Sequence, residues 1–435
     1  MFTVAFHFLG CRLNEAENEF LARAFVEAGH AMVDLEDHPD VIVLNTCGVT
    51  ADAMRKSRNL ARRMAALRPR LLVLMGCAMD LMADGEYPLS DDELVSESGT
   101  DMQILRILKK DKANAAPLII AAMEHLRVME RGGTPLPPPV YRLRIRSFIK
   151  IQDGCNNRCT YCAVRLARGP ERSESTSQIL GEIQKCLALG EKEIVLTGVQ
   201  LGAWREEQRR LPDLIKDILS HTDVKRLRLG SVEPWHVRPE LWELWKDRRL
   251  CPHFHIPVQS GSDTVLTAMC RRTSIEGYLQ KMEAMRAAIP NLRISTDLIV
   301  GFPGETETAW HETLDFIQKA RFDEAHLFRF SPRPNTIAAS LPNPVPPDIK
   351  RKRWNEAQSL IQSIRRDIMQ KSIGAKHEVL WENIHGTTDN GAARWSGYSE
   401  NYLRFIRAFP AGKMERGTVT TECFGEADLA NNLEE

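Results

Sequence analysis

The sequence predicts a multidomain α/β protein with three parts: an N-terminal parallel sheet, a second domain that forms an α/β barrel or part of one, and a small C-terminal antiparallel β domain. Buried-strand patterns alternate with helical patterns in the first two parts, and short alternating runs separated by turns follow in the third. The length of 435 residues also exceeds what one hydrophobic core usually organises.

In the first part, predicted for residues 1–130, three apolar runs each end at a cysteine. The runs begin at residues 4, 41 and 71, and the cysteines are Cys11, Cys47 and Cys77. Helical patterns lie between them, one running up to Gly29 and one starting after Thr50. This alternation predicts a parallel sheet with right-handed crossovers, in which ligands bind beyond the carboxyl ends of the strands. All three cysteines fall at such ends, so residues far apart in sequence can converge.

A Pro- and Gly-rich stretch predicts a linker over residues 131–140, and the second domain is predicted for residues 141–370. A capping-box pattern at Ser175 and an apolar face that includes Trp310 predict two of its helices. Chemistry in such barrels lies at the carboxyl ends of the strands. The predicted strands are residues 146–152, 193–198, 226–231, 254–259, 293–302 and 324–331.

Residues 348–371 predict one long polar helix that bridges to the third domain, residues 371–435. Two short alternating runs, residues 377–381 and 402–406, lie between Gly- and Asn-rich turns and predict antiparallel strands. We expect the acidic tail to be loose.

The composition argues for a cytoplasmic protein without a strong overall charge. The chain has 58 Lys and Arg against 58 Asp and Glu, so any nucleic-acid site must be local. No window approaches the ~20 apolar residues of a membrane span, and the N-terminus lacks a signal peptide pattern. Ten cysteines in a cytosolic chain indicate metal binding or catalysis rather than disulfides.

The strongest chemical signal is the triplet Cys155, Cys159 and Cys162. Three thiolates in one short loop can reach one metal centre, and the loop supplies no fourth cysteine. A structural zinc would ordinarily have a fourth ligand, whereas an iron-sulfur cluster with one open iron could bind a substrate-like molecule. The spacing alone leaves zinc and plain structural cysteines open.

This C-x3-C-x2-C loop, with Tyr161 before the third cysteine, resembles the radical S-adenosylmethionine (SAM) superfamily. The resemblance implies a 4Fe-4S cluster that binds SAM and cleaves it reductively to a 5′-deoxyadenosyl radical. Flanking motifs over essentially the whole chain resemble the methylthiotransferases: residues 146–155, 167–169, 197–202, 255–262 and 295–306. That family implies a flavodoxin-like N-terminal domain whose Cys11, Cys47 and Cys77 hold a second 4Fe-4S cluster, a partial (βα)6 radical SAM barrel and a C-terminal RNA-binding TRAM domain.

Within the family, residues 10–14, 152–157 and 397–404 are most similar to the threonylcarbamoyladenosine tRNA methylthiotransferases. These insert sulfur and a methyl group at carbon 2 of N6-threonylcarbamoyladenosine, next to the anticodon, and use two SAM molecules. The implied partners are the tRNA anticodon stem-loop, an electron donor of the flavodoxin or ferredoxin type and a sulfur source. Arg165, where a proline is usual, and residues 79–100 depart from the family pattern.

The resemblance places SAM contacts at strand ends of the barrel, although a Gly or Thr there is also ordinary turn chemistry. Arg271 and Arg272 could meet a substrate or cofactor carboxylate, or form a solvated pair. His253 and His255 share one face of a predicted core strand, which favours packing over a metal site. The predicted SAM-binding residues are Tyr161, Thr197, Gly198, Ser231, Glu233, Gln259 and Asp297.

Two regions could contact RNA. A basic helix after Cys47 is a candidate for binding phosphates, or simply a solvated helix face. The third domain has seven Lys or Arg against ten Asp or Glu, so its RNA role rests on the resemblance, and its aromatic residues could stack on bases or form a core. The residues concerned are Arg55, Lys56, Arg58, Arg62, Arg63, Arg68 and Arg70 in the helix, and Trp395, Tyr398, Tyr402 and Arg404 in the third domain.

Transfer of a methylthio group requires its donor within reach of the activated carbon, so both clusters are expected to face one cavity. Other acceptors remain open, namely isopentenyladenosine in tRNA or a ribosomal protein. A non-enzymatic alternative is an iron-sulfur redox sensor or RNA-binding regulator. It explains less, because it needs neither the polar strand ends of the barrel nor an incomplete cluster.

Overall fold

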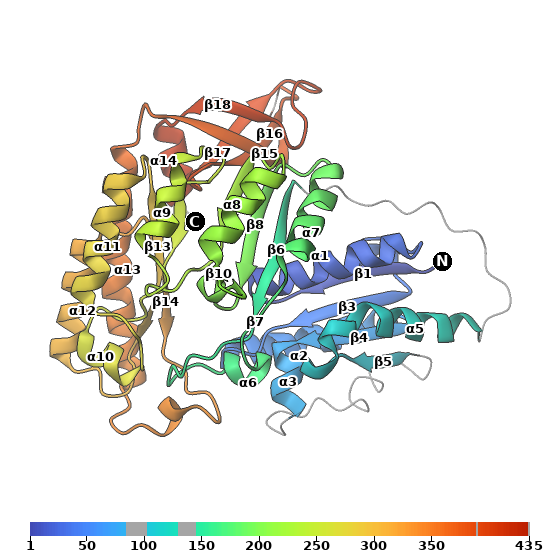
Figure 1. The fold of residues 1–435 in the computed structure, drawn as a ribbon, viewed down its shortest axis with the longest axis horizontal. Coiled ribbons are helices and arrows are strands. Elements are labelled where there is room, and N and C mark those ends of the chain that lie inside the picture. Colours follow the sequence, from blue (N-terminus) through green and yellow to red (C-terminus); the bar gives the residue numbers. More distant parts are fainter. Residues whose placement is uncertain (84–101, 129–144, 389, 434–435) are drawn as a thin grey trace. The chain divides into compact units, whose positions relative to one another are not determined.

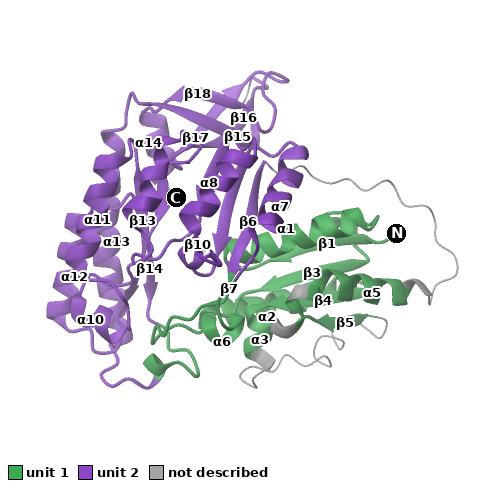
Figure 2. Ribbon diagram, viewed as in Figure 1, with its two compact units in different colours: residues 1–143, 153–172, 331–339 green, residues 144–152, 173–330, 340–435 purple. Residues whose placement is uncertain are grey.

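The computed structural model describes residues 1–83, 102–128, 145–388 and 390–433 (Figure 1). These form two compact units (Figure 2): unit 1 comprises residues 1–143, 153–172 and 331–339, and unit 2 comprises residues 144–152, 173–330 and 340–435. The units do not follow the predicted domain boundaries, which stay predictions. The predicted linker 131–140 and most of the divergent stretch 79–100 lie outside the described residues.

Unit 1 contains the predicted parallel sheet, with the strand order β2-β1-β3-β4-β5 that is typical of flavodoxin-like folds. Every residue of β3 and β4 is buried, because helices cover both faces of the sheet, and this explains their uninterrupted apolar sequences. The strands are β1 (Thr3–Phe8), β2 (Ala31–Met32), β3 (Val41–Thr46), β4 (Leu71–Gly76) and β5 (Gln103–Arg106). The α-helices are α1 (Arg12–Glu27), α2 (Ala51–Ala66), α3 (Cys77–Ala83), α5 (Ala115–Val128) and α6 (Val164–Arg168).

Both helix predictions in this region are confirmed. Helix α1 ends just before Gly29, whose positive φ of 82° suits a left-handed stop. Thr50 is the N-cap of helix α2, and its hydroxyl accepts a hydrogen bond from the Ala53 N–H.

Unit 2 contains the predicted partial barrel of six parallel strands. Two sheets, β11-β8-β6-β7 and β12-β13-β14, meet through single-residue bridges that include Ser231 to His255. The predicted capping box at Ser175 is present at the start of α7. The strands are β6 (Arg146–Asp153), β7 (Arg172–Ser173), β8 (Glu193–Gly198), β11 (Arg226–Leu229), β12 (His253–His255), β13 (Arg293–Val300) and β14 (Glu324–Arg329), with the hairpin β9 (Arg205–Glu206) and β10 (Arg209–Arg210).

Helices pack on the outer face of these strands and form one continuous hydrophobic core with them. The predicted bridging helix is confirmed as α13 (Pro347–Gln370). The other α-helices are α7 (Thr176–Ala188), α8 (Leu211–His221), α9 (Pro239–Trp242), α10 (Asp263–Ala268), α11 (Ile275–Ala288) and α12 (Glu307–Ala320). No helix in the described ranges combines the length and apolar character needed to cross a bilayer.

The last part of unit 2 is the predicted antiparallel sheet, with the strand order β17-β16-β15-β18. Its strands are β15 (Lys376–Thr387), β16 (Ala393–Ser399), β17 (Arg404–Phe409) and β18 (Val419–Cys423). The prediction of a loose acidic tail is wrong for residues 426–433, which form α14 (Glu426–Leu433). Leu429 is buried in the core of this sheet, and Asp428 pairs with Arg407 at 2.5 Å.

A buried ion network joins the barrel to this β-sheet within unit 2. Glu193 at the start of β8 is fully buried and lies 2.8–2.9 Å from the guanidinium groups of Arg146, Arg226 and Arg228. Burial alone would raise the pKa of Glu193, but the three guanidinium groups outweigh it and hold the pKa well below its ordinary value. Arg228 also lies over the ring of Tyr402, 3.6 Å from its centroid.

We expect Glu193→Gln to lower the free energy of unfolding by about 3–5 kcal/mol, because the change leaves three buried cations without their shared carboxylate. Urea denaturation followed by circular dichroism measures this. Glu182→Gln on α7 is the matched control, since its ion pair with Lys185 is partly exposed and worth at most about 1 kcal/mol. Equal losses in both variants would contradict the assignment.

Candidate metal centres and their surroundings

The three N-terminal cysteines follow neighbouring strands of the unit 1 sheet. Cys11 is the N-cap of α1, Cys47 directly follows β3, and Cys77 is the first residue of α3 after β4. Because β1, β3 and β4 are adjacent in the sheet, the cysteines lie at one edge, as the sequence predicts. They are within electrostatic reach of one another, since Cys77 and Cys11 both add to the effect of burial in raising the pKa of Cys47.

Two glycines permit this close approach. Gly10 has a φ of +129°, and a Cβ at this position would lie 2.9 Å from the Cys47 Cβ. Gly76 has a φ of +100°, and a Cβ there would lie 2.2 Å from the Thr46 carbonyl oxygen. A side chain at either position would therefore separate the strand ends that carry Cys47 and Cys77.

The second cysteine triplet also lies in unit 1, within residues 153–172. The Cys155 N–H donates to the Gly169 carbonyl at 3.0 Å, which closes the loop onto the segment after α6. The Cys162 N–H donates to the Cys159 carbonyl at 3.1 Å, and the Asn157 N–H lies 3.4 Å from the Cys155 Sγ. All three cysteines are half-buried. The structure therefore holds both triplets in the same compact unit (Figure 2).

Arg168, at the end of α6, connects the two cysteine regions. Its side chain is only 2% exposed. Nε lies 3.2 Å from the Cys77 Sγ, Nη1 donates to Glu17 at 2.8 Å and to Asp153 at 3.1 Å, and Nη2 donates to Asn14 at 2.7 Å. One guanidinium group thus contacts α1, the start of α3 and the residue two positions before Cys155.

The charge of Arg168 acts directly on the first triplet. Burial raises the pKa of the Cys77 thiol, and the neighbouring guanidinium opposes that shift by favouring the thiolate. Burial also raises the pKa of Cys47 to about 11. Both cysteines must therefore lose a proton to the solvent when they bind a metal.

Five of the seven predicted SAM-binding residues lie at or beyond strand ends in unit 2. Thr197 and Gly198 end β8, Ser231 and Glu233 follow β11, and Gln259 follows β12. Asp297 lies within β13 rather than at its end, and Tyr161 belongs to unit 1.

Glu233 and Arg271 form a pair that the sequence does not reveal. The Arg271 Nη2 lies 2.6 Å from the Glu233 carboxylate, and the guanidinium also lies over the ring of Trp235. Arg271 is 8% exposed, so the interpretation of residues 271 and 272 as a solvated surface pair is wrong for Arg271. Its neighbour Arg272 also stacks on Trp235.

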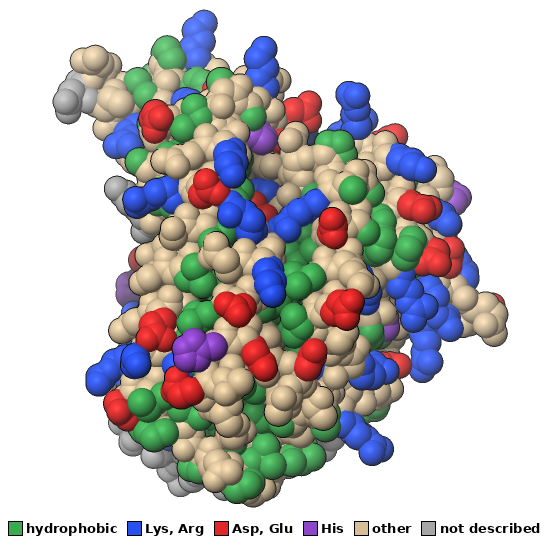
Figure 3. All heavy atoms as spheres, turned by 90° about the vertical axis from the view of Figure 1, so that its left-hand side faces the viewer, with side chains coloured by type: hydrophobic (Ala, Val, Ile, Leu, Met, Phe, Trp, Pro, Cys, Tyr) green, Lys and Arg blue, Asp and Glu red, His purple; other side chains and the backbone are tan. Residues whose placement is uncertain are grey.

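The candidate RNA contacts divide into exposed and packed groups. In α2, Arg55 and Lys56 are exposed and pair with Asp52, while Arg63 also faces solvent. On the face of the molecule in Figure 3, basic and acidic side chains are interspersed, as expected for a chain of zero net charge. In the C-terminal sheet, Trp395 is a core residue.

Two tyrosines, one in β16 and one in the turn before β17, pack on the buried ion network. Tyr402 lies against Arg228, and the ring of Tyr398 lies 5.5 Å from the Arg146 guanidinium. These contacts favour the interpretation of the aromatic residues as packing groups over stacking on bases.

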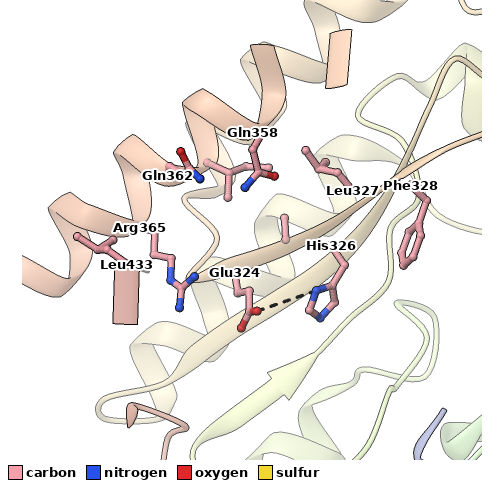
Figure 4. A pocket seen from close by; sticks show the side chains of 10 residues that line it. Glu324, His326, Leu327, Phe328, Gln358, Gln362, Arg365 and Leu433 are labelled. Atoms are coloured by element: carbon pink, nitrogen blue, oxygen red, sulfur yellow. Dashed lines mark ion pairs between the residues drawn. The ribbon is translucent and has the colours of Figure 1, made fainter. Parts of the chain in front are cut away.

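The strand β14 borders a separate cavity of about 380 Å³ in unit 2, shown in Figure 4. Its lining, all within the described chain, includes none of the predicted cysteine or SAM-binding residues. The lining comes from β14, α13 and α14: Glu324, Ala325, His326, Leu327, Phe328, Gln358, Ile361, Gln362, Arg365 and Leu433.

Comparison with known proteins identifies two family profiles in the chain. Residues 149–317 match the radical SAM superfamily, and residues 3–89 match the uncharacterized protein family UPF0004. A threonylcarbamoyladenosine tRNA methylthiotransferase MtaB from Bacillus subtilis is 32% identical over 93% of this chain and 90% of its own length. The chain belongs to the radical SAM methylthiotransferase family. It is thus an enzyme of this kind, as its motifs indicate.

Other relatives of this methylthiotransferase show how far the similarity extends. MtaB from Thermotoga maritima is 32% identical over 93% of this chain and 91% of its own. A tRNA-2-methylthio-N(6)-dimethylallyladenosine synthase from Pelodictyon phaeoclathratiforme is 30% identical over 88% and 87%. Among solved structures, the radical SAM methyltransferase TsrM from Kitasatospora setae superposes with a TM-score of 0.56 at 14% identity, covering 78% of this chain and 77% of that one. This last likeness shows the fold.

The donor sets fit the iron-sulfur cofactor chemistry of the family. Each triplet offers three cysteine sulfurs, the usual ligands of such clusters. The Asn157 N–H beside Cys155 and the Arg168 guanidinium beside Cys77 are the kind of hydrogen-bond donors that stabilise metal-bound thiolates. Cys11, Cys47 and Cys77 would hold one cluster, and Cys155, Cys159 and Cys162 the other.

Sequence reasoning missed the partners of Arg168. The residue belongs to a recognised family motif, residues 167–169, but nothing in that motif indicates that it is buried. Asn14 likewise lies in a recognised motif, and Glu17 reads as an ordinary acidic helix residue. Their shared role depends on contacts across 151 to 154 sequence positions.

We expect Arg168→Gln to lower the free energy of unfolding of the metal-free protein by about 3–5 kcal/mol, because Glu17 and Asp153 lose a buried cation. Arg172→Gln is the control, since Arg172 pairs with the same Asp153 at 2.6 Å but is 46% exposed. It should cost at most about 1 kcal/mol. Urea denaturation under reducing conditions measures both, and a loss of similar size for Arg172→Gln would refute the special place of Arg168.

The raised pKa of Cys47 gives a pH dependence. In the metal-free protein the thiol is protonated at neutral pH, and only the thiolate reacts with iodoacetamide. The alkylation rate of Cys47, followed by peptide mass spectrometry, should rise about tenfold per pH unit from pH 7 to pH 10 and level off only near the pKa of about 11. A plateau below pH 9 would show that burial does not raise this pKa.

Proposed function

We propose that this methylthiotransferase inserts sulfur and a methyl group at carbon 2 of N6-threonylcarbamoyladenosine next to the tRNA anticodon, using two 4Fe-4S clusters and two SAM molecules. The observation that carries this proposal is the placement of both cysteine triplets in one compact unit. Within that unit Arg168 contacts both Cys77 and Asp153, and Asp153 lies two residues before Cys155. A sulfur-transfer enzyme needs its two reactive centres held in a stable mutual arrangement.

The chemistry explains why two centres are needed. The adenine C–H bond resists acid and base catalysis at neutral pH, so sulfur insertion requires a cofactor with radical chemistry. A cluster with SAM at Cys155, Cys159 and Cys162 supplies that chemistry when bound. Cys11, Cys47 and Cys77 would hold the second cluster, which would supply the chemistry of sulfur transfer.

The protein's own side chains orient these components. Arg168 places its charge beside the Cys77 sulfur, where it favours the ligating thiolate. In unit 2, Thr197, Gly198, Ser231 and Gln259 occupy the strand ends at which barrels of this type bind their ligands. We assign SAM binding to this edge, together with Glu233, which follows β11.

The acceptor is assigned from sequence motifs and relatives together. Two of the relatives described above are named for threonylcarbamoyladenosine, and residues 10–14, 152–157 and 397–404 resemble that group. Asn14, the last residue of the first motif, contacts Arg168. The second candidate is dimethylallyladenosine (isopentenyladenosine), favoured by relatives named for it at 30–31% identity.

The partners follow from the reaction. We propose the tRNA anticodon stem-loop as substrate, because single-stranded loops present bases that can enter a protein pocket. A flavodoxin or ferredoxin type protein would supply electrons, and a separate donor would supply sulfur. The C-terminal sheet acts as an RNA-binding TRAM domain, and the enzyme works in the cytoplasm.

Cysteine variants test the division of labour. Anaerobically reconstituted protein should bind about eight irons per chain, and Cys159→Ala and Cys47→Ala about four each. Cys159→Ala should abolish reductive SAM cleavage, whereas Cys47→Ala should retain cleavage and lose methylthio transfer, because each removes a ligand of a different centre. Cys186→Ala, a buried cysteine in the barrel core, is the matched control with both activities intact. Loss of both activities in both cluster variants would contradict the assignment.

Nucleoside mass spectrometry of tRNA from a deletion strain identifies the acceptor in the same set of experiments. The strain should lack 2-methylthio-N6-threonylcarbamoyladenosine and accumulate its precursor, N6-threonylcarbamoyladenosine. Loss of the dimethylallyladenosine derivative instead would establish the second candidate.

A further inference from the structure

Three metal-ligating side chains meet on the barrel strands of unit 2, apart from any cysteine. His255 of β12, Asp297 of β13 and His326 of β14 bring one ligand atom each to within 4.8 Å of one another. The His255 Nε2 and the Asp297 Oδ1 are 3.3 Å apart. The rings of His255 and His326 lie 5.6 Å apart between centroids.

Strand register explains why these residues meet. In the parallel sheet β12-β13-β14, His255 pairs with Ser295, and Asp297 pairs with His326. The alternate residues Ile294 and Leu298 face the helix-covered core, so Ser295 and Asp297 face the opposite side of the sheet. Figure 4 shows the same alternation in β14, where His326 points away from α13 and Leu327 points toward it.

His255 has a partner that orients its ring. Its Nδ1 lies 2.9 Å from the Ser295 Oγ, which leaves Nε2 directed toward Asp297. Histidines that bind metals usually donate the N–H of the other ring nitrogen to such a partner, which fixes the tautomer of the ligand. His326 has an outer neighbour too, since its Nδ1 lies 4.0 Å from the Glu324 carboxylate, as the dashed line in Figure 4 marks.

The spacing suits a small divalent ion. Zinc bound at about 2.0–2.1 Å in a tetrahedral site holds its ligand atoms about 3.3 Å apart. His255 and Asp297 already have this separation. His326 is 51% exposed on the last strand of the sheet, so its ring can close the remaining distance without repacking a core.

We propose that His255, Asp297 and His326 form a mononuclear site for a divalent transition-metal ion, of which Zn²⁺ is the test case. Two imidazoles and one carboxylate select such ions over Ca²⁺ and Mg²⁺, which prefer all-oxygen sites. Three protein ligands leave a coordination position open for an oxygen ligand, as in catalytic rather than structural zinc sites. The site goes beyond the proposed function. It assigns Asp297, which the family resemblance places among the SAM contacts but which lies within β13 rather than at its end, to metal binding.

The test is metal analysis of the reconstituted holoenzyme, in which the cysteines are occupied by iron. The protein is equilibrated with a slight excess of Zn²⁺, desalted, and its zinc and iron are counted by inductively coupled plasma mass spectrometry. For the wild type we expect one zinc per chain after subtraction of the zinc found in the same protein before equilibration with Zn²⁺. His255→Ala, Asp297→Asn and His326→Ala should each lose it with iron unchanged, which shows that the variants remain folded.

His311→Ala is the matched control, an exposed histidine on α12 whose Nδ1 faces the Glu307 carbonyl. It should retain the zinc. X-ray absorption at the zinc edge should show only nitrogen and oxygen ligands near 2.0–2.1 Å, whereas sulfur at about 2.3 Å would reveal cysteine-bound zinc and overturn the proposal. Absence of bound zinc in the wild type, or its retention in all three variants, would also overturn it and leave His255 and Asp297 as a simple hydrogen-bonded pair.

Discussion

The buried guanidinium of Arg168 is the interaction on which the arrangement of unit 1 depends. A cation that is removed from water must have anionic and hydrogen-bonding partners, and Arg168 finds them in Glu17, Asp153 and Asn14. These partners come from segments that also carry cysteines or flank them. Satisfying one buried charge therefore fixes where Cys77 lies relative to the loop that begins at Cys155.

In unit 2 the central buried charge is negative rather than positive. There a single buried carboxylate, Glu193, is surrounded by three arginines, and the network extends to Tyr402 of the C-terminal sheet. The net contribution of such a network to stability is small, because desolvation offsets much of the Coulomb energy, whereas removal of one partner leaves buried charges uncompensated. In this enzyme the buried network adds polar contacts between the barrel and the β-sheet, because Arg226 and Arg228 donate to backbone carbonyls of that sheet.

Both units carry candidate functional residues at comparable positions of parallel sheets. Strand ends leave backbone groups and loop residues unpaired by the ladder, so ligands and cofactors can bind there without disturbing the core. The N-terminal cysteines follow this rule, as do most of the predicted SAM-binding residues. His255, Asp297 and His326 follow a different one, because they meet through register across the inner face of neighbouring strands.

Local patterns in the sequence were sufficient for the elements themselves. The six barrel strands, the helices after Cys11 and Thr50, the bridging helix and the antiparallel sheet are all readable, because apolar periodicity and caps act over a few residues. The cysteine triplets were equally visible, since their spacing is a property of the chain. The helix α14 could not be read from local patterns, because its Leu429 packs in a core formed by residues distant in the sequence.

Only the tertiary structure decided which residues distant in the chain are in contact. Arg168 and Cys77 are 91 positions apart, Arg271 and Glu233 are 38 apart, and the three residues of the histidine and aspartate cluster lie on three strands. An arginine in the sequence looks the same whether it is solvated or buried, because its environment is set by the packing of elements and not by its neighbours in the chain. The sequence therefore determined which elements and ligands exist, and folding determined which of them act on one another.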